Sequence, residues 1–164
     1  MTKLIEKCKF VVGFPPVDIN TAMDNTTYTK GDYVNMKNWG HLTIVLIGGV
    51  SAGGTGSVTV KCATSVAGGS VDSLTTVKWR YLNTNTSTAS DTWTKTAVTA
   101  YTWDHPATAN LSNVIEIDAD ELPTDHNFVA LNIDSAGGTT LMSCLYILSE
   151  PRYISAETAP TAIS

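Results

Sequence analysis

The sequence predicts an all-β fold: an antiparallel β-sandwich, favoured as a jelly roll of about eight strands with extended N-terminal and C-terminal segments. Short apolar runs rich in β-branched residues recur along the chain, with turn signals roughly every eight to fifteen residues. No stretch has the apolar periodicity of a three-turn amphipathic helix. Only 15% of the residues are charged, which is low for a protein with surface helices. A closed lipocalin-type barrel is the alternative, but frequent glycine-rich breaks favour a sandwich.

The chain is expected to form one domain, 1–164, because apolar residues are spread along it without a long polar linker. Residues 1–18 are a possible arm, and residues 154–164 are expected to form a flexible or partner-docked tail. Lys7–Phe14 is strand-like. The end of the arm is expected to leave the sheet as an extended loop, because proline has no N–H to donate and restricts the residue before it. This piece comprises Phe14, Pro15, Pro16, Val17 and Asp18.

The central element is a pair of β-rich runs around a glycine-rich stretch. His41–Ile47 is apolar on both faces, which predicts a strand buried in the middle of the sandwich. Ser57–Thr64 alternates, so that Val58, Val60 and Cys62 share one face. Because glycine supplies turn conformations, the stretch between them predicts that the two runs form a hairpin.

Further strands are predicted on both sides of this pair. They span 33–36, 74–82, 91–104, 113–118, 128–133 and 141–148. The segment 91–104 is expected to be one long strand with Trp93, Lys95 and Trp103 on the same face. The last two segments are expected to form a closing hairpin, and Ala119–Leu122 one helical turn before Pro123.

Charge and hydropathy argue against two classes of partner. The net charge is −5 and Lys and Arg form no run, so we expect no nucleic-acid binding. No segment reaches about 18 consecutive apolar residues, so we expect no membrane partner. Glu6 and Lys7 interrupt the N-terminal apolar run, which is untypical of a signal peptide. The odd number of cysteines then predicts free, buried thiols in a protein made in a reducing cytoplasm: Cys8, Cys62 and Cys144.

Signatures of catalysis and of metal binding are weak, so we expect no enzyme, no catalytic residues, no cofactor and no metal. The three histidines, at 41, 105 and 126, lack the spacing of zinc ligands. The acidic residues between 118 and 125 lack the order of a calcium-binding loop. No GxSxG motif is present. A hydrolase that uses Asp104 and Glu116 as paired carboxylates is a minor alternative.

The tryptophans carry the main alternative function, a carbohydrate- or receptor-binding module. Aromatic rings on an exposed sheet face can stack on sugars, although core packing is the more usual role of such residues. The candidate stacking platforms are Trp39, Trp93 and Trp103.

A resemblance to a known family covers nearly the whole chain. The segments 32–46, 58–68 and 141–153, together with Pro15–Asp18 and Ile115–Leu122, resemble a family of small tailed-bacteriophage virion proteins, the capsid decoration (cement) proteins of jelly-roll type. The resemblance implies binding to the phage major capsid protein on the capsid exterior, synthesis in the host bacterial cytoplasm and assembly as a homo-oligomer, with a trimer favoured.

Two extended segments are the candidate contacts with the capsid or with a neighbouring subunit, because extended backbone can add to a sheet edge or fill a groove. They are Phe14, Pro15, Pro16, Val17 and Asp18, and Pro151, Arg152 and Tyr153. For Phe14 and Tyr153, capping the ends of the sandwich is the alternative role.

Overall fold

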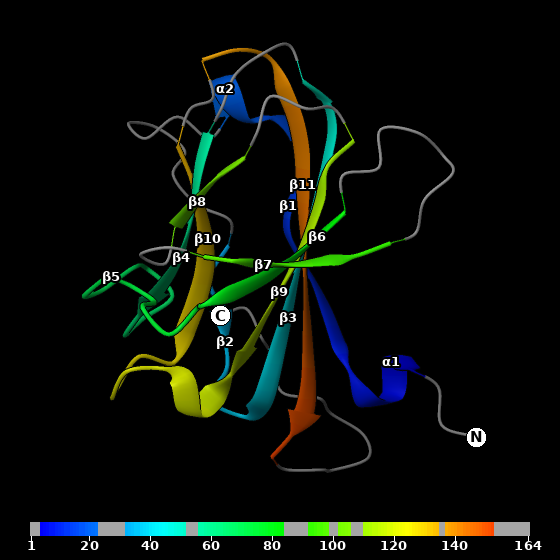
Figure 1. The fold of residues 1–164 in the computed structure, drawn as a ribbon. Coiled ribbons are helices and arrows are strands. Elements are labelled where there is room, and N and C mark those ends of the chain that lie inside the picture. Colours follow the sequence, from blue (N-terminus) through cyan, green and yellow to red (C-terminus); the bar gives the residue numbers. More distant parts are fainter. Residues whose placement is uncertain are drawn as a thin grey trace.

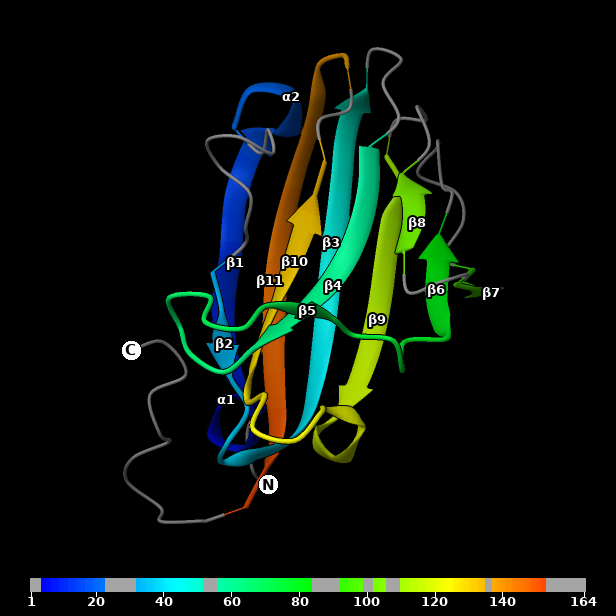
Figure 2. The same cartoon turned by 90° about the vertical axis from the view of Figure 1, so that its left-hand side faces the viewer.

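The computed structural model describes residues 4–22, 32–51, 56–83, 92–98, 102–105, 110–134 and 137–152. Within them the protein is nearly all β: two antiparallel sheets lie face to face (Figures 1 and 2). The helical elements are single turns, namely α1 (Leu4–Lys7), α2 (Ile19–Ala22) and the 3₁₀ turn η1 (Ala119–Glu121). The predicted sandwich is therefore confirmed. The expected tail, 154–164, lies outside the described residues.

The larger sheet has six strands and the smaller sheet has five. The order in the larger sheet is β1 (Lys9–Asp18), β11 (Thr140–Pro151), β3 (Trp39–Ser51), β9 (Ser112–Asp118), β6 (Trp79–Asn83) and β7 (Thr94–Ala97). The smaller sheet has the order β2 (Val34–Asn35), β10 (Phe128–Ile133), β4 (Gly56–Ala63) and β5 (Asp72–Ser73), and β8 (Thr102–His105) also pairs with β4.

The pairing of eight of these strands is nested. The first pairs with the last, β1 with β11, and then β2 pairs with β10, β3 with β9 and β4 with β8. A long antiparallel hairpin wrapped into two sheets has this order, which is that of a jelly roll. The remaining strands, β5 to β7, are inserted between β4 and β8. Of these, β6 and β7 form a hairpin that extends the larger sheet beyond β9.

The core lies between the inner faces of the two sheets. Alternation buries Leu42, Ile44 and Leu46 on β3, and the predicted inner face of β4 is buried as well. Tyr146 of β11 reaches across the core, where its hydroxyl accepts a hydrogen bond from the backbone N–H of Leu131 at 3.0 Å. This hydrogen bond joins the two sheets. It also gives the Leu131 amide a partner, because β2 pairs with β10 only at Phe128 and Val129 and does not extend to Leu131.

The predicted hairpins are wrong. β3 and β4 follow each other along the chain but lie in opposite sheets, and so do β10 and β11. Glycine-rich stretches indicate where the chain reverses, but they do not specify whether the next strand joins the same sheet. The predicted long strand 91–104 is likewise two strands, β7 and β8, in different sheets. Trp93 and Trp103 therefore do not share a strand face.

The proline-containing segment belongs to the larger sheet and is not a free arm. Strand β1 includes Pro15 and Pro16, and its pairing with β11 continues to Asp18 opposite Leu141. The register shifts between Phe14 and Val17, so the two prolines lie where the ladder is interrupted. β1 is an edge strand, where a missing N–H costs little, and this position explains why the prolines are tolerated.

All three cysteines are free thiols, with Cys62 and Cys144 buried and Cys8 half-buried between α1 and β1. Burial raises the pKa of the Cys144 thiol, which keeps it protonated. Among the described residues, no helix has the length and apolar character needed to cross a membrane.

Candidate functional site

The first predicted contact segment is divided between core and surface. Phe14 is buried among the core residues. The Asp18 carboxylate accepts hydrogen bonds from the backbone N–H groups of Asn20, at 3.1 Å, and Thr140, at 3.0 Å, and so holds α2 and the start of β11. Val17 packs partly against the core, which leaves Pro15 and Pro16 as the exposed members.

The second predicted contact segment lies at the other end of the sandwich. Pro151 pairs with Trp39 at the end of β11, and the Arg152 amide donates to the carbonyl of Asn38 at 2.9 Å. Tyr153 lies outside the described residues. Asp18 pairs near the start of β11, and the length of that strand puts roughly 30 Å between the two segments. They therefore do not form one surface.

The tryptophans divide into buried and exposed pairs. Trp39 and Trp103, both proposed as stacking platforms, are only 2% and 7% exposed and belong to the core. Trp93 is 44% exposed, and Trp79, which was not among the predicted platforms, is the most exposed at 51%. The prediction is therefore wrong for Trp39 and Trp103, because the wrapping of the strands turns both rings inward.

Strand β6 explains why Trp79 is exposed. Arg80, the next residue, points into the interior, where its Nη1 donates to Asn113 Oδ1 and its guanidinium lies 5.7 Å from the ring centroid of Trp103. Burial lowers the pKa of Arg80. Because neighbouring residues of a strand face opposite ways, Trp79 and Tyr81 both project from the outer face. The signal was present in the sequence as Trp-Arg-Tyr, but it does not show which side is the interior.

Five apolar side chains form a row across the outer face of the larger sheet. Strand register places them side by side, one each from β1, β11, β3, β9 and β6: Val12, Leu145, Val45, Val114 and Tyr81. Each alternates with core residues of its strand, so its side chain points away from the core. With strands about 4.8 Å apart, the row is roughly 20 Å long.

Further apolar residues flank this row on both sides. Phe10 pairs with Ile147 on one side, and Ile47 and Leu141 lie on the other. We call the row and these four residues the apolar band. Val12 is 58% exposed and Ile47 48%. A contiguous apolar patch of this kind typically marks a protein interface.

The band explains the unusual pattern of the 41–47 run. Apolar residues on both faces predicted a strand covered on both sides. In the structure the inner face of β3 is buried, whereas on its outer face Val45 is partly exposed and Ile47 about half exposed. The prediction of burial on both faces is therefore wrong for this chain by itself.

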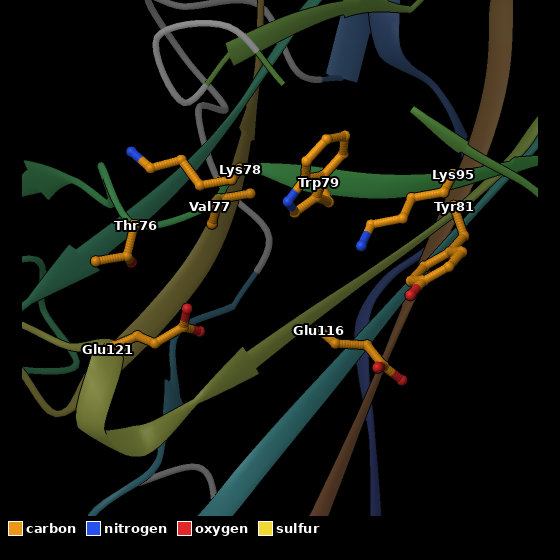
Figure 3. A pocket seen from close by; sticks show the side chains of 8 residues that line it. All are labelled: Thr76, Val77, Lys78, Trp79, Tyr81, Lys95, Glu116 and Glu121. Atoms are coloured by element: carbon orange, nitrogen blue, oxygen red, sulfur yellow. The ribbon is translucent and has the colours of Figure 1, made fainter. Parts of the chain in front are cut away.

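A hollow of about 350 Å³ lies beside the β6 end of the apolar band. We call it the aromatic pocket; its lining residues are Thr76, Val77, Lys78, Trp79, Tyr81, Lys95, Glu116 and Glu121 (Figure 3). The Lys95 ammonium, from β7, lies 4.6 Å from the centroid of the Trp79 ring. On the other side of the hollow, Glu116 comes from β9 and Glu121 from η1 (Figure 3). The pocket thus combines aromatic surfaces with hydrogen-bond donors and acceptors.

Acidic residues and a histidine gather at the nearby ends of β3 and β9. His41 Nδ1 lies 2.6 Å from Asp118 Oδ1, and its Nε2 lies 4.0 Å from Glu116 Oε1. Glu121 Oε2 accepts the backbone N–H of Asp118 at 3.0 Å, which caps η1. In the described part of the chain, no three His, Cys, Asp or Glu side chains are arranged to hold a metal ion.

Comparison with known proteins finds similarity to solved structures but none in sequence. No protein-family model matches the chain. No curated protein matches its sequence. The crystal structure of the SPBc2 prophage-derived protein YomS is similar at a TM-score of 0.47 and 8% sequence identity, over 87% of this chain and 93% of that chain.

Proposed function

We propose that the protein is a structural, non-catalytic component of a phage head, which binds the outer surface of the capsid and stabilises it by bridging capsomers. Its partner is the phage major capsid protein, and its place is the exterior of the virion after synthesis in the bacterial cytoplasm. The apolar band is the observation that carries the proposal. The sequence resemblance to tailed-phage decoration proteins supports the choice of partner.

The band suits a rigid, extended partner surface. It lies on five hydrogen-bonded strands of one sheet, so the backbone that carries its side chains is already ordered before binding. A surface ordered in this way loses little backbone entropy on association, which favours binding. Polar residues such as Thr43 and Ser112 border the band, as in the rim of a protein interface.

Stabilisation of the shell would follow from mass action. A protein that binds only the expanded shell lowers the free energy of that state, and many copies on one shell add their effects. We also propose a trimer formed through the edge of β1, because closed symmetry removes an exposed strand edge. Leu4 and Ile5 of α1, which lie next to this strand in the chain, are largely exposed.

The second candidate function is glycan binding by the virion, as the sequence predicted it through Trp39, Trp93 and Trp103. Of its three predicted platforms only Trp93 is exposed, because Trp39 and Trp103 lie in the core. Capsid binding therefore remains the leading proposal.

The test is co-sedimentation of the purified protein with undecorated mature heads and with unexpanded proheads, measured as bound copies per particle. We expect saturable binding to mature heads. Val12→Lys and Ile47→Lys should weaken this binding at least tenfold, because each buries a charge in the apolar contact. Both side chains are about half exposed in the free protein, so the fold should tolerate the changes.

Val71→Lys is the matched control, since Val71 is 38% exposed but lies outside the band, between β4 and β5. It should bind mature heads like the wild type. Absence of the wild-type protein from the head pellet at micromolar concentration would contradict capsid binding. Equal effects of all three substitutions would contradict the band as the contact surface.

A further inference from the structure

We propose that the aromatic pocket is a saccharide-binding site that takes one neutral pyranose ring. The pocket shares Tyr81 with the apolar band, but the proposal does not rest on capsid binding; the residues that carry it are Trp79, Tyr81, Lys95, Glu116 and Glu121.

The aromatic residues provide the apolar surface that such a ligand needs. Trp79 and Tyr81 project from the same face of β6, roughly 7 Å apart along the strand. Trp79 remains half exposed although the Lys95 ammonium lies against its ring. The C–H face of a pyranose packs on an indole ring in the way that other apolar groups do, while its hydroxyls stay at the rim.

The polar residues match sugar hydroxyls, which both donate and accept hydrogen bonds. The ammonium groups of Lys78 and Lys95 can only donate, and Lys78 Nζ already donates to the Thr75 carbonyl at 2.5 Å. The carboxylates of Glu116 and Glu121 can only accept. Among the described residues, none of these four groups forms an ion pair with another of them within 4.0 Å. Oε2 of Glu121 accepts a hydrogen bond from the Asp118 amide. The proposal uses the other carboxylate oxygen of Glu121 as an acceptor for a ligand hydroxyl.

The charges of the lining select a neutral ligand. Two lysines and two glutamates cancel, so an anionic or a cationic ligand would meet like charge on one side of the hollow. The volume of about 350 Å³ is at the small end of ligand sites and fits a single ring. Because the hollow is open, we expect a dissociation constant on the order of 1 mM for a monosaccharide.

The test is a titration of ¹⁵N-labelled protein with the methyl glycosides of glucose, galactose, mannose and N-acetylglucosamine, followed by NMR chemical shifts. We expect saturable shifts of the Trp79 indole N–H with at least one of them. Trp79→Ala should abolish binding. Glu116→Ala, which removes the acceptor, should weaken it about tenfold, as expected for losing a hydrogen bond to a charged group.

Trp93→Ala is the matched control, because Trp93 is an exposed tryptophan that does not line the pocket. It should bind the sugar like the wild type. Absence of saturable shifts with all four glycosides would overturn the proposal, and so would unchanged binding by Trp79→Ala. None of these substitutions touches Val12 or Ile47, so sugar binding and head binding can fail separately.

Discussion

At the scale of single residues, Gly13 has no room for a side chain. A Cβ atom added to it would lie 2.8 Å from Tyr146 Cε2 and 3.1 Å from Cys144 Sγ. The Tyr146 ring cannot retreat without disturbing its hydrogen bond to the Leu131 amide, and this bond links the two sheets. Glycine at position 13 is therefore required by close packing of β1 on β11.

We predict that Gly13→Ala lowers the free energy of unfolding by about 1–3 kcal/mol, the usual cost of overpacking a core. Urea denaturation followed by circular dichroism measures it. Gly49→Ala is the control, because its added Cβ would meet nothing closer than Leu141 Cβ at 3.6 Å. Equal stability of the two variants would contradict this account of Gly13.

His126 joins two loops through both of its ring nitrogens. Its Nδ1 lies 2.9 Å from the carbonyl of Thr124, and its Nε2 lies 3.0 Å from the carbonyl of Ser70. Neutral imidazole has one N–H, so only the protonated ring can donate to both carbonyls. The Thr124 carbonyl, the Ser70 carbonyl and the Asp72 carboxylate raise the pKa of His126, while partial burial opposes them.

Because the folded state binds this proton more tightly than the unfolded state, the stabilisation is complete below about pH 6.5, the ordinary histidine value. It should be lost as the pH rises through the raised pKa of the folded protein. We predict that the urea midpoint falls over this interval in the wild type and that His126→Gln removes this part of the fall. Parallel pH profiles for both proteins would refute the prediction.

At the scale of elements, Asp18 fastens the junction of β1, α2 and β11. Its carboxylate accepts hydrogen bonds from the backbone amides of Asn20 and Thr140. Thr140 is fully buried. In Asp18→Ala both amides lose this acceptor. We predict a loss of about 1–3 kcal/mol in the free energy of unfolding, as for other hydrogen bonds to a charged group. Asp18→Asn, which keeps an acceptor oxygen, should lose less.

Differential scanning calorimetry tests this prediction. In a protein of this size the midpoint temperature of unfolding should fall by about 2–4 °C for each kcal/mol lost. Asp104→Ala on β8 is the control, because Asp104 is an exposed carboxylate on a strand. A similar fall in both alanine variants would show that Asp18 has no special part in the junction.

The β6–β7 hairpin is the other element with a distinct role. It is inserted between two paired strands of the jelly roll and extends the larger sheet beyond β9. In this position it brings Trp79, Tyr81 and Lys95 beside Glu116. The aromatic pocket therefore depends on the insertion, whereas most of the apolar band lies on strands of the basic jelly roll.

At the scale of the whole molecule, the nested pairing brings the first and last strands, β1 and β11, side by side and builds the apolar band partly from them. Both proposed surfaces lie on the larger sheet, where five strands contribute to the band. The segments that the sequence suggested as contacts lie at opposite ends of β11. The surface that we propose for capsid binding is therefore a sheet face and not an arm.

The sequence by itself determined the class of fold and the local faces of several strands. The alternation in β4 and β9 and the single helical turn before Pro123 follow from neighbouring residues, and the structure confirms them. These features depend on interactions within a few residues, which is why a pattern in the chain can reveal them.

The tertiary structure alone decided which strands pair and which aromatic residues reach the surface. β3 pairs with β9 and β11 rather than with β4, Pro15 and Pro16 lie within an edge strand, and Trp79 rather than Trp103 is exposed. Partners in these contacts are distant in sequence, and a strand with period two has the same pattern whichever face turns inward. Only the packing of the two sheets selects the inner face, and with it the residues left for binding.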